Sequence, residues 1–231
     1  MIIDPEDIGL RKHYLYEILA TTFSKIQENF IPNTASMGIR VIDYNIFSIL
    51  PYPSTTTFNN LKKNRYLTIN FVDNVYLYAI ASLKNLEKNK NLENLTAESY
   101  KFYKISDNTE NDIIFPYLKG AWATIFCKTI DEIQINKKDN FGNTFISEFK
   151  LKAIYIKKFK ESFKLFNRAE NLALETIILA TRLIKANEIR DKVLSLEYKR
   201  KIEDNIQQIR RFGKNPNALK AIERVEIFIG K

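Results

Sequence analysis

The chain has 231 residues, of which 45% are hydrophobic and 27% charged, and this composition excludes extensive disorder. No apolar run approaches the roughly 20 residues that a membrane-spanning helix needs. The amino end, Met1 to Asp7, is acidic and lacks a signal-peptide pattern. The single cysteine allows no internal disulfide, which suits a reducing compartment, so we expect a cytoplasmic protein.

The net charge of +9 is unevenly distributed along the chain. Residues 150–231 carry 20 Lys and Arg against 10 Asp and Glu, whereas residues 1–149 are nearly neutral. A polyanion such as nucleic acid is one candidate partner for this basic segment. We favour the alternative, a solvated helical surface, because no ordered alternation of aromatic and basic residues accompanies the charge.

The first third of the chain reads as short strands with one helix. Residues 13–23 combine β-branched and aromatic residues and predict a first strand. We then expect a polar loop at about 24–36 and strands at about 37–43 and 46–51. A short helix at about 56–63 and a further strand at about 65–72 follow. This order, with its short connections, favours an antiparallel barrel over a doubly wound sheet. The six glycines are scattered singly and form no dinucleotide fingerprint or P-loop.

The remaining two thirds change from strands to helices near Lys160. A helix is expected at 75–83, and two long strands joined by a hairpin are expected at 117–136 and 143–157. Three helices then follow, from about 168 to 186, 189 to 211 and 216 to 229, with Asn215 and Pro216 as the start signal of the last. We therefore predict an α+β protein, with an antiparallel barrel domain at 1–160 and a C-terminal helical bundle at 161–231.

Polar residues gather at the ends of three predicted strands. Four consecutive hydroxyl residues, Ser54 to Thr57, stand where a strand meets a helix N-terminus, a place where N–H groups bind phosphate. An ordinary N-cap is the alternative, but it requires only one hydroxyl. The small residues 33–38 run into the strand that contains Arg40, whose guanidinium can bind a phosphate through two oxygens. Asn70 lies in a third strand that ends in polar groups.

The ordered set of these motifs resembles a mainly archaeal family of uncharacterised flavoproteins. The resemblance rests on Glu17–Thr22, Asn33–Gly38, Tyr52–Leu61, Asn70–Asn74, Phe166–Glu170 and Ala180–Leu183, and so spans most of the chain. That family has the FMN-binding split-barrel fold, akin to flavin reductases and pyridoxamine-phosphate-oxidase-like proteins. The resemblance implies an FMN site and a homodimer, but no particular substrate.

The resemblance also assigns site residues. The phosphate would be held by Arg40 and by the four hydroxyl residues Ser54, Thr55, Thr56 and Thr57. The edge of the flavin ring would be lined by Asn33, Ala35, Ser36 and Met37. Asn60 and Asn70 are expected to contact the ribityl chain or the ring.

Neither a catalytic residue nor a metal site can be named from the sequence. His13 is the only histidine, which excludes a histidine-based triad and a multi-histidine metal site. The leading hypothesis is therefore an FMN-binding flavoprotein, with an NAD(P)H-dependent flavin reductase or oxidoreductase as its finer form. The alternatives are a dimeric scaffold for another phosphate ligand, such as pyridoxal phosphate, and a basic nucleic-acid-binding protein that uses the C-terminal helices.

Overall fold

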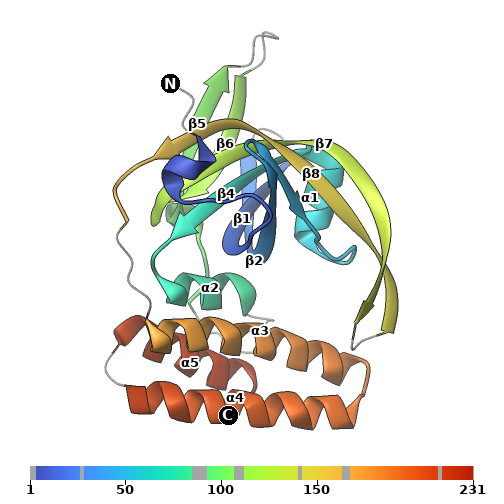
Figure 1. Cartoon of the computed structure of the whole chain (residues 1–231), viewed down its shortest axis with the longest axis vertical. Coiled ribbons are helices and arrows are strands. Elements are labelled where there is room, and N and C mark those ends of the chain that lie inside the picture. The colour runs from blue at the N-terminus through green and yellow to red at the C-terminus, as the bar shows by residue number, and fades with distance from the viewer. Residues whose placement is uncertain are drawn as a thin grey trace. The chain divides into compact units, whose positions relative to one another are not determined.

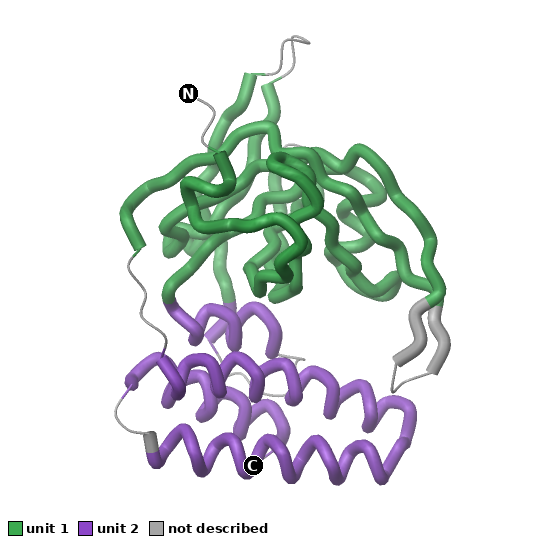
Figure 2. Tube along the Cα trace, viewed as in Figure 1, with its two compact units in different colours: residues 1–73, 95–138, 143–162 green, residues 74–94, 139–142, 163–231 purple. Residues whose placement is uncertain are grey.

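The computed structural model describes residues 4–26, 29–84, 93–106, 112–139, 142–162, 167–212 and 215–230. The chain forms two compact units, 1–73, 95–138 and 143–162 in the first and 74–94, 139–142 and 163–231 in the second (Figure 2). The division predicted from the sequence counted the segment 74–94 with the barrel. Within the described residues, no helix is both long enough and apolar enough to cross a membrane.

The first unit contains a closed antiparallel barrel of six strands, in the order β1-β2-β3-β8-β7-β4 (Figure 1). β5 and β6 form a separate two-stranded sheet. The elements of this unit are η1 (Pro5–Ile8), β1 (Leu15–Ile26), β2 (Asn29–Asp43), β3 (Ile46–Ile49), α1 (Thr56–Asn64), β4 (Tyr66–Val72), η2 (Ala97–Ser99), β5 (Tyr100–Ser106), β6 (Asp112–Leu118), β7 (Ala121–Asp139) and β8 (Gly142–Lys158). The predicted α+β barrel is confirmed.

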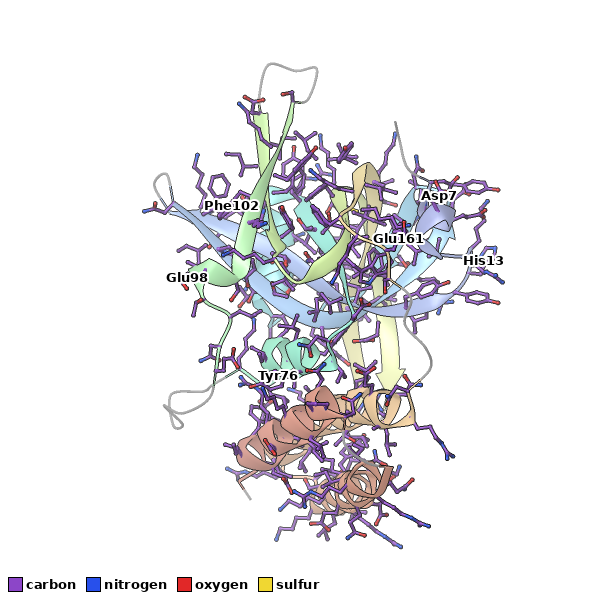
Figure 3. All side chains as sticks on the ribbon, turned by 90° about the vertical axis from the view of Figure 1, so that its left-hand side faces the viewer. Asp7, His13, Tyr76, Glu98, Phe102 and Glu161 are labelled. Atoms are coloured by element: carbon purple, nitrogen blue, oxygen red, sulfur yellow. The ribbon has the colours of Figure 1, made fainter. Side chains whose placement is uncertain are left out.

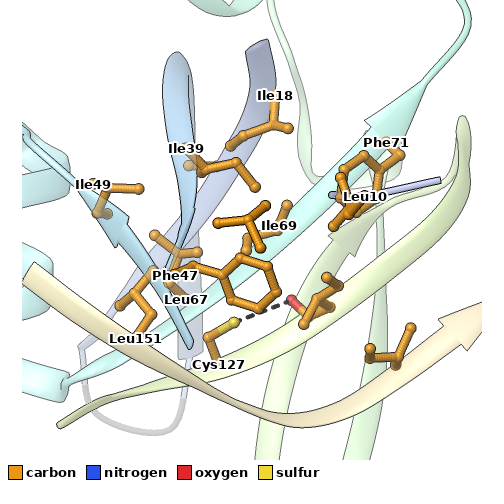
Figure 4. Close-up of a cluster of buried hydrophobic side chains, with 14 of the residues drawn as sticks. Leu10, Ile18, Ile39, Phe47, Ile49, Leu67, Ile69, Phe71, Cys127 and Leu151 are labelled. Atoms are coloured by element: carbon orange, nitrogen blue, oxygen red, sulfur yellow. Dashed lines mark hydrogen bonds between the residues drawn. The ribbon is translucent and has the colours of Figure 1, made fainter. Parts of the chain in front are cut away.

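Alternate residues of the barrel strands point inward and form one hydrophobic core (Figure 4). The fully buried members include Ile18 of β1, Ile39 of β2, Phe47 of β3 and Ile69 of β4. Ile8 and Leu10, from η1 and the residues after it, belong to the same core, so the amino-terminal segment is part of the barrel unit. The residues that alternate with these inward-pointing ones along each strand lie on the outer face of the barrel.

The outer face of β7 is covered by the β5–β6 hairpin. Phe115 and Tyr117 of β6 pack with Phe126 of β7 in a second hydrophobic cluster. Phe102 of β5 points away from this cluster and is 51% exposed (Figure 3). Two polar contacts described below also connect the hairpin to β2 and β4.

The second unit consists of helices α2 (Val75–Ser82), α3 (Arg168–Glu188), α4 (Lys192–Phe212) and α5 (Pro216–Phe228). α5 begins as predicted, because Asn215 accepts a hydrogen bond from the Ala218 N–H and Pro216 occupies the first helical position. Arg224 of α5 is only 2% exposed, and its guanidinium donates to the carbonyl oxygens of Leu83 (2.8 Å) and Glu93. This arginine therefore holds the segment after α2 against α5.

Two predictions of local structure were wrong. The expected loop at 24–36 is strand, since β1 continues to Ile26 and β2 begins at Asn29. The expected single strand at 117–136 is divided by a turn at Lys119 and Gly120, so that residues 112–118 belong to β6, and the β5–β6 hairpin was not predicted. In the first place, pairing of β2 with β1 outweighs the weak strand preference of its small and polar residues, and in the second, pairing with β5 continues only to Leu118.

Candidate functional site

The edge of β2 that faces away from β1 is the first component of the site. β1 pairs with β2 continuously from Asn29 to Arg40. β3, on the other side, pairs with β2 only from Arg40 to Asp43. Among the described residues, the stretch before Arg40 therefore has no strand partner on that side. Alternate backbone N–H and C=O groups point out of such an edge and are available to a ligand.

Small side chains make this free edge accessible. Ala35, Ser36 and Gly38 are all half-buried and leave the backbone close to the surface. Met37 points to the opposite side from Ser36 and packs against the barrel core. The sequence had identified this stretch as a loop, whereas the structure shows it as an extended strand whose backbone donors and acceptors are held in a fixed order.

The N-terminus of α1 is the second component. Thr55 is the N-cap, with its Oγ1 accepting from the Phe58 N–H (3.2 Å) and donating to the Tyr52 carbonyl oxygen (2.7 Å). Ser54 and Thr56 are exposed, and their hydroxyls have no hydrogen-bond partner in the described part of the chain. The first N–H groups of a helix have no acceptor within it, and the helix dipole adds partial positive charge there. This turn can therefore bind an anion.

Two hydrogen bonds, one part-buried and one buried, hold α1 against β2 and β1. The Asn33 side chain of β2 donates to the Thr57 Oγ1 (3.3 Å), and the Asn60 side chain donates to the Thr22 Oγ1 of β1 (3.1 Å). Thr57 is 1% exposed and Asn60 6% exposed. Thr57, a predicted phosphate contact, and Asn60, a predicted ribityl or ring contact, thus anchor α1 to the barrel, with the first turn of α1 at Asn33 of β2.

Arg40 and Asn70 lie elsewhere on the barrel. Arg40 is exposed and points outward, since its neighbours Ile39 and Val41 are buried in the core. Asn70 is completely buried on the outer face of β4. No hydrogen bond or ion pair among the described residues connects either side chain to residues 54–57.

The amide of Asn70 joins three strands. Its Nδ2 donates to the Leu19 carbonyl oxygen (2.9 Å) and to the Thr21 Oγ1 (3.0 Å), and its Oδ1 accepts from the Leu118 N–H (2.9 Å). Asn70 therefore fixes β6 to β1 and β4. The amide has no donor or acceptor left that faces an open ligand site.

Two polar contacts near the free edge were not predicted from the sequence. A chain of hydroxyl groups runs from Thr21 to Thr34 (2.7 Å) and on to Tyr100 of β5 (3.0 Å), and burial raises the pKa of the Tyr100 phenol. Ser36 Oγ donates to the Glu17 Oε1 at 2.6 Å. The sequence does not reveal these contacts, because the partners are 13 or more residues apart and meet only through the pairing of β1 with β2 and the packing of β5.

The site is an open edge rather than an enclosed pocket. Two open grooves of about 300 and 370 Å³ occur along α3 and α4, in the second unit, and are lined mainly by polar and charged side chains such as Glu175, Arg182 and Gln208. No group of three His, Cys, Asp or Glu side chains in the described ranges is placed to hold a metal ion. His13 is exposed, and its backbone N–H donates to the Val41 carbonyl oxygen of β2 at 2.7 Å.

The chain is similar to known proteins both in sequence and in structure. The chain is 26% identical over 174 residues to an uncharacterized protein of Methanocaldococcus jannaschii, covering 74% of this chain and 76% of the relative. Its structure is similar to the crystal structure of an FMN-bound protein from Methanosarcina mazei, with a TM-score of 0.71 at 19% identity, covering 96% of this chain and 98% of the other.

A sequence-family comparison matches residues 16–158, which include all but the first residues of the barrel and the whole candidate site. The Methanosarcina mazei protein is described as a member of the same family. The matched segment is more than half of the chain. The chain therefore belongs to the family described as protein of unknown function (DUF447), N-terminal domain.

Proposed function

We propose that the protein binds FMN along the free edge of β2, with the phosphate at the N-terminus of α1. The observation that carries the proposal is the contact between Asn33 and Thr57, which joins the free edge to the hydroxyl-rich turn. From Asn33 to Ser36, β2 extends over about 10 Å, since a strand rises about 3.4 Å per residue. This distance suits a ligand with an anionic tail at one end and a flat polar ring at the other.

The residues fit such a ligand by their chemistry. Ser54 and Thr56 offer free hydroxyls, and the first N–H groups of α1 offer donors to the phosphate. The backbone of residues 33–37 offers alternating donors and acceptors to the polar edge of the ring, where Ala35 and Ser36 leave room. A role for Arg40 and Asn70 in binding FMN rests on the sequence resemblance alone. In the structure, neither side chain is bonded to residues 54–57. Support for the cofactor itself comes from the FMN-bound Methanosarcina mazei protein, whose fold is similar along the chain.

The finer proposal is an oxidoreductase, with NAD(P)H as the electron donor and a homodimer as the working form. When bound, FMN would supply the hydride and electron transfer, so the protein has only to hold and orient the ring. Backbone N–H groups at the free edge would stabilise negative charge that develops on the ring during reduction.

A comparison of FMN with riboflavin tests the proposal, because the two ligands differ only in the phosphate. We expect FMN to bind at least tenfold more tightly than riboflavin, measured by quenching of flavin fluorescence. In the double variant Ser54→Ala, Thr56→Val, the FMN affinity should fall to near that of riboflavin, and the riboflavin affinity should not change. Thr181→Val, in the second unit, serves as the control. A wild-type protein that binds neither flavin refutes the proposal, and oxidation of NADPH by the FMN-loaded protein tests its finer form.

A further inference from the structure

Glu17 of β1 is a charged residue on the paired side of β2, across that strand from the free edge, and the proposed function does not yet use it. Its Oε1 accepts a hydrogen bond from the Ser36 Oγ at 2.6 Å, and both residues are half-buried. An O–H···O bond of this length is typical of an ionised acceptor. The bond turns the Ser36 hydroxyl toward β1, and therefore away from the unpaired side of β2.

The surroundings leave the carboxylate close to the edge. Glu17 lies directly opposite Gly38 in the register of β1 and β2, so no side chain stands between Glu17 and the edge at that position. A Cβ at Gly38 would lie only 3.0 Å from the Leu15 Cδ1, which shows how closely β1 side chains approach β2 here. Adjacent strands are about 4.8 Å apart, so the charge of Glu17 is about one strand spacing from the backbone that is proposed to hold the ring.

We propose that Glu17 is a positioning residue that also sets the redox balance of the bound flavin. This inference rests on the proposed function. By holding Ser36, Glu17 keeps the hydroxyl clear of the ring and fixes the shape of the edge. Through its negative charge, it weakens the binding of the reduced, more electron-rich flavin relative to the oxidised flavin, and so lowers the reduction potential of the cofactor.

Two substitutions separate these roles. Glu17→Gln keeps an oxygen that accepts from Ser36 but removes the charge, whereas Ser36→Ala keeps the charge but removes the hydrogen bond. A partly solvated charge that lies about 5–10 Å from the flavin ring changes the equilibrium between reduced and oxidised flavin about five- to tenfold. We therefore expect Glu17→Gln to raise the ratio of reduced to oxidised FMN affinity by that factor. A tenfold change corresponds to a midpoint potential that is about 30 mV more positive for a two-electron couple.

Ser36→Ala should instead leave this ratio within about twofold of the wild-type value, and should weaken the binding of oxidised FMN about fivefold, because the edge loses its fixed shape. Glu132→Gln is a control for the loss of a serine-bound carboxylate elsewhere in the barrel unit, since Glu132 is also half-buried and accepts from Ser147 at 2.7 Å, in addition to its ion pair with Lys62. The control variant should retain the wild-type potential and FMN affinity.

The outcomes are distinct. If the wild-type protein binds no FMN, the proposed function itself fails. If FMN binds and Glu17→Gln has the same potential as the wild-type protein and Glu132→Gln, the inference about Glu17 is overturned. Should Glu17→Gln not fold, Ser36→Ala decides, since a folded Ser36→Ala variant with unchanged FMN affinity also overturns the inference.

Discussion

Replacement of Asn70 by leucine separates a structural role of this residue from a role in ligand binding. The side chain is completely buried and makes hydrogen bonds to the Leu19 carbonyl oxygen, the Thr21 hydroxyl and the Leu118 N–H. Leucine has a similar size but no polar atoms. The variant Asn70→Leu therefore leaves these three groups buried, and leaves the Leu118 N–H without the acceptor that the amide provides.

The expected loss of stability follows from these contacts. Each hydrogen bond contributes about 1 kcal/mol net, and a buried group left without a partner costs about 1–3 kcal/mol. Part of this cost is recovered by relaxation, so we expect the variant to lose about 3–4 kcal/mol. This is a large fraction of the roughly 5–15 kcal/mol that stabilises an ordinary domain. With a slope of about 2 kcal/mol per molar urea, the midpoint of unfolding should fall by about 1.5–2 M.

Trp122 allows this measurement in the barrel alone, because it is the only tryptophan of the chain and lies in β7. Urea unfolding followed by tryptophan fluorescence therefore reports on the first unit. Asn59→Leu is the matched control, since Asn59 is exposed on α1, and its midpoint should remain within about 0.3 M of the wild-type value. A midpoint for Asn70→Leu within that same range, together with weaker FMN binding, would refute the structural role and favour the ligand contact expected from the sequence.

Three further predictions concern other parts of the chain. Thr55→Val removes the N-cap acceptor of the Phe58 N–H and should destabilise the barrel unit by about 1 kcal/mol, measured by the same urea titration, whereas Thr55→Ser should restore stability. Arg224→Met removes the guanidinium that binds the Leu83 and Glu93 carbonyl oxygens, so the free energy of unfolding of the second unit should fall by about 2–4 kcal/mol. Circular dichroism follows the helices of this unit, and its urea transition should shift to lower urea while the Trp122 fluorescence transition of the barrel does not. Circular-dichroism and fluorescence transitions that both stay at the wild-type midpoint would contradict this. Cys127 is buried, which raises the pKa of its thiol, so a thiol reagent at pH 8 should label it only in denaturant, and rapid labelling of the native protein would show that the barrel core opens readily.

Much of the fold could be predicted from local sequence patterns. The helix at 56–64 follows a clear N-cap, and the helix from Pro216 follows an Asn-Pro start signal, so both were placed to within two residues. The strand at 66–72 has the apolar and β-branched residues typical of a strand buried on both faces. These segments could be predicted because local preference and tertiary structure agree.

The free edge of β2 could not be predicted, and the reason is physical. Asn33, Ala35 and Ser36 have little intrinsic preference for strand, and only pairing with β1 holds them extended. The sequence identified the small residues of this stretch and the hydroxyls at 54–57 as site candidates. It could not show that Asn33 bonds to Thr57 or that Ser36 bonds to Glu17. Nor could it show that the Asn70 amide is fully used in hydrogen bonds to β1 and β6. Each of these contacts depends on how separate elements pack together.

The contribution of the amino-terminal segment to the barrel core has a practical consequence. Ile8 and Leu10 are nearly fully buried in the same cluster as Phe71, although residues 4–14 contain only a short 3-10 helix. Shortened proteins that start at β1 would uncover this apolar surface and would be expected to aggregate during expression. A purification tag is therefore better placed at the carboxyl end, or separated from Asp4 by a flexible spacer, so that Ile8 and Leu10 can still close the core.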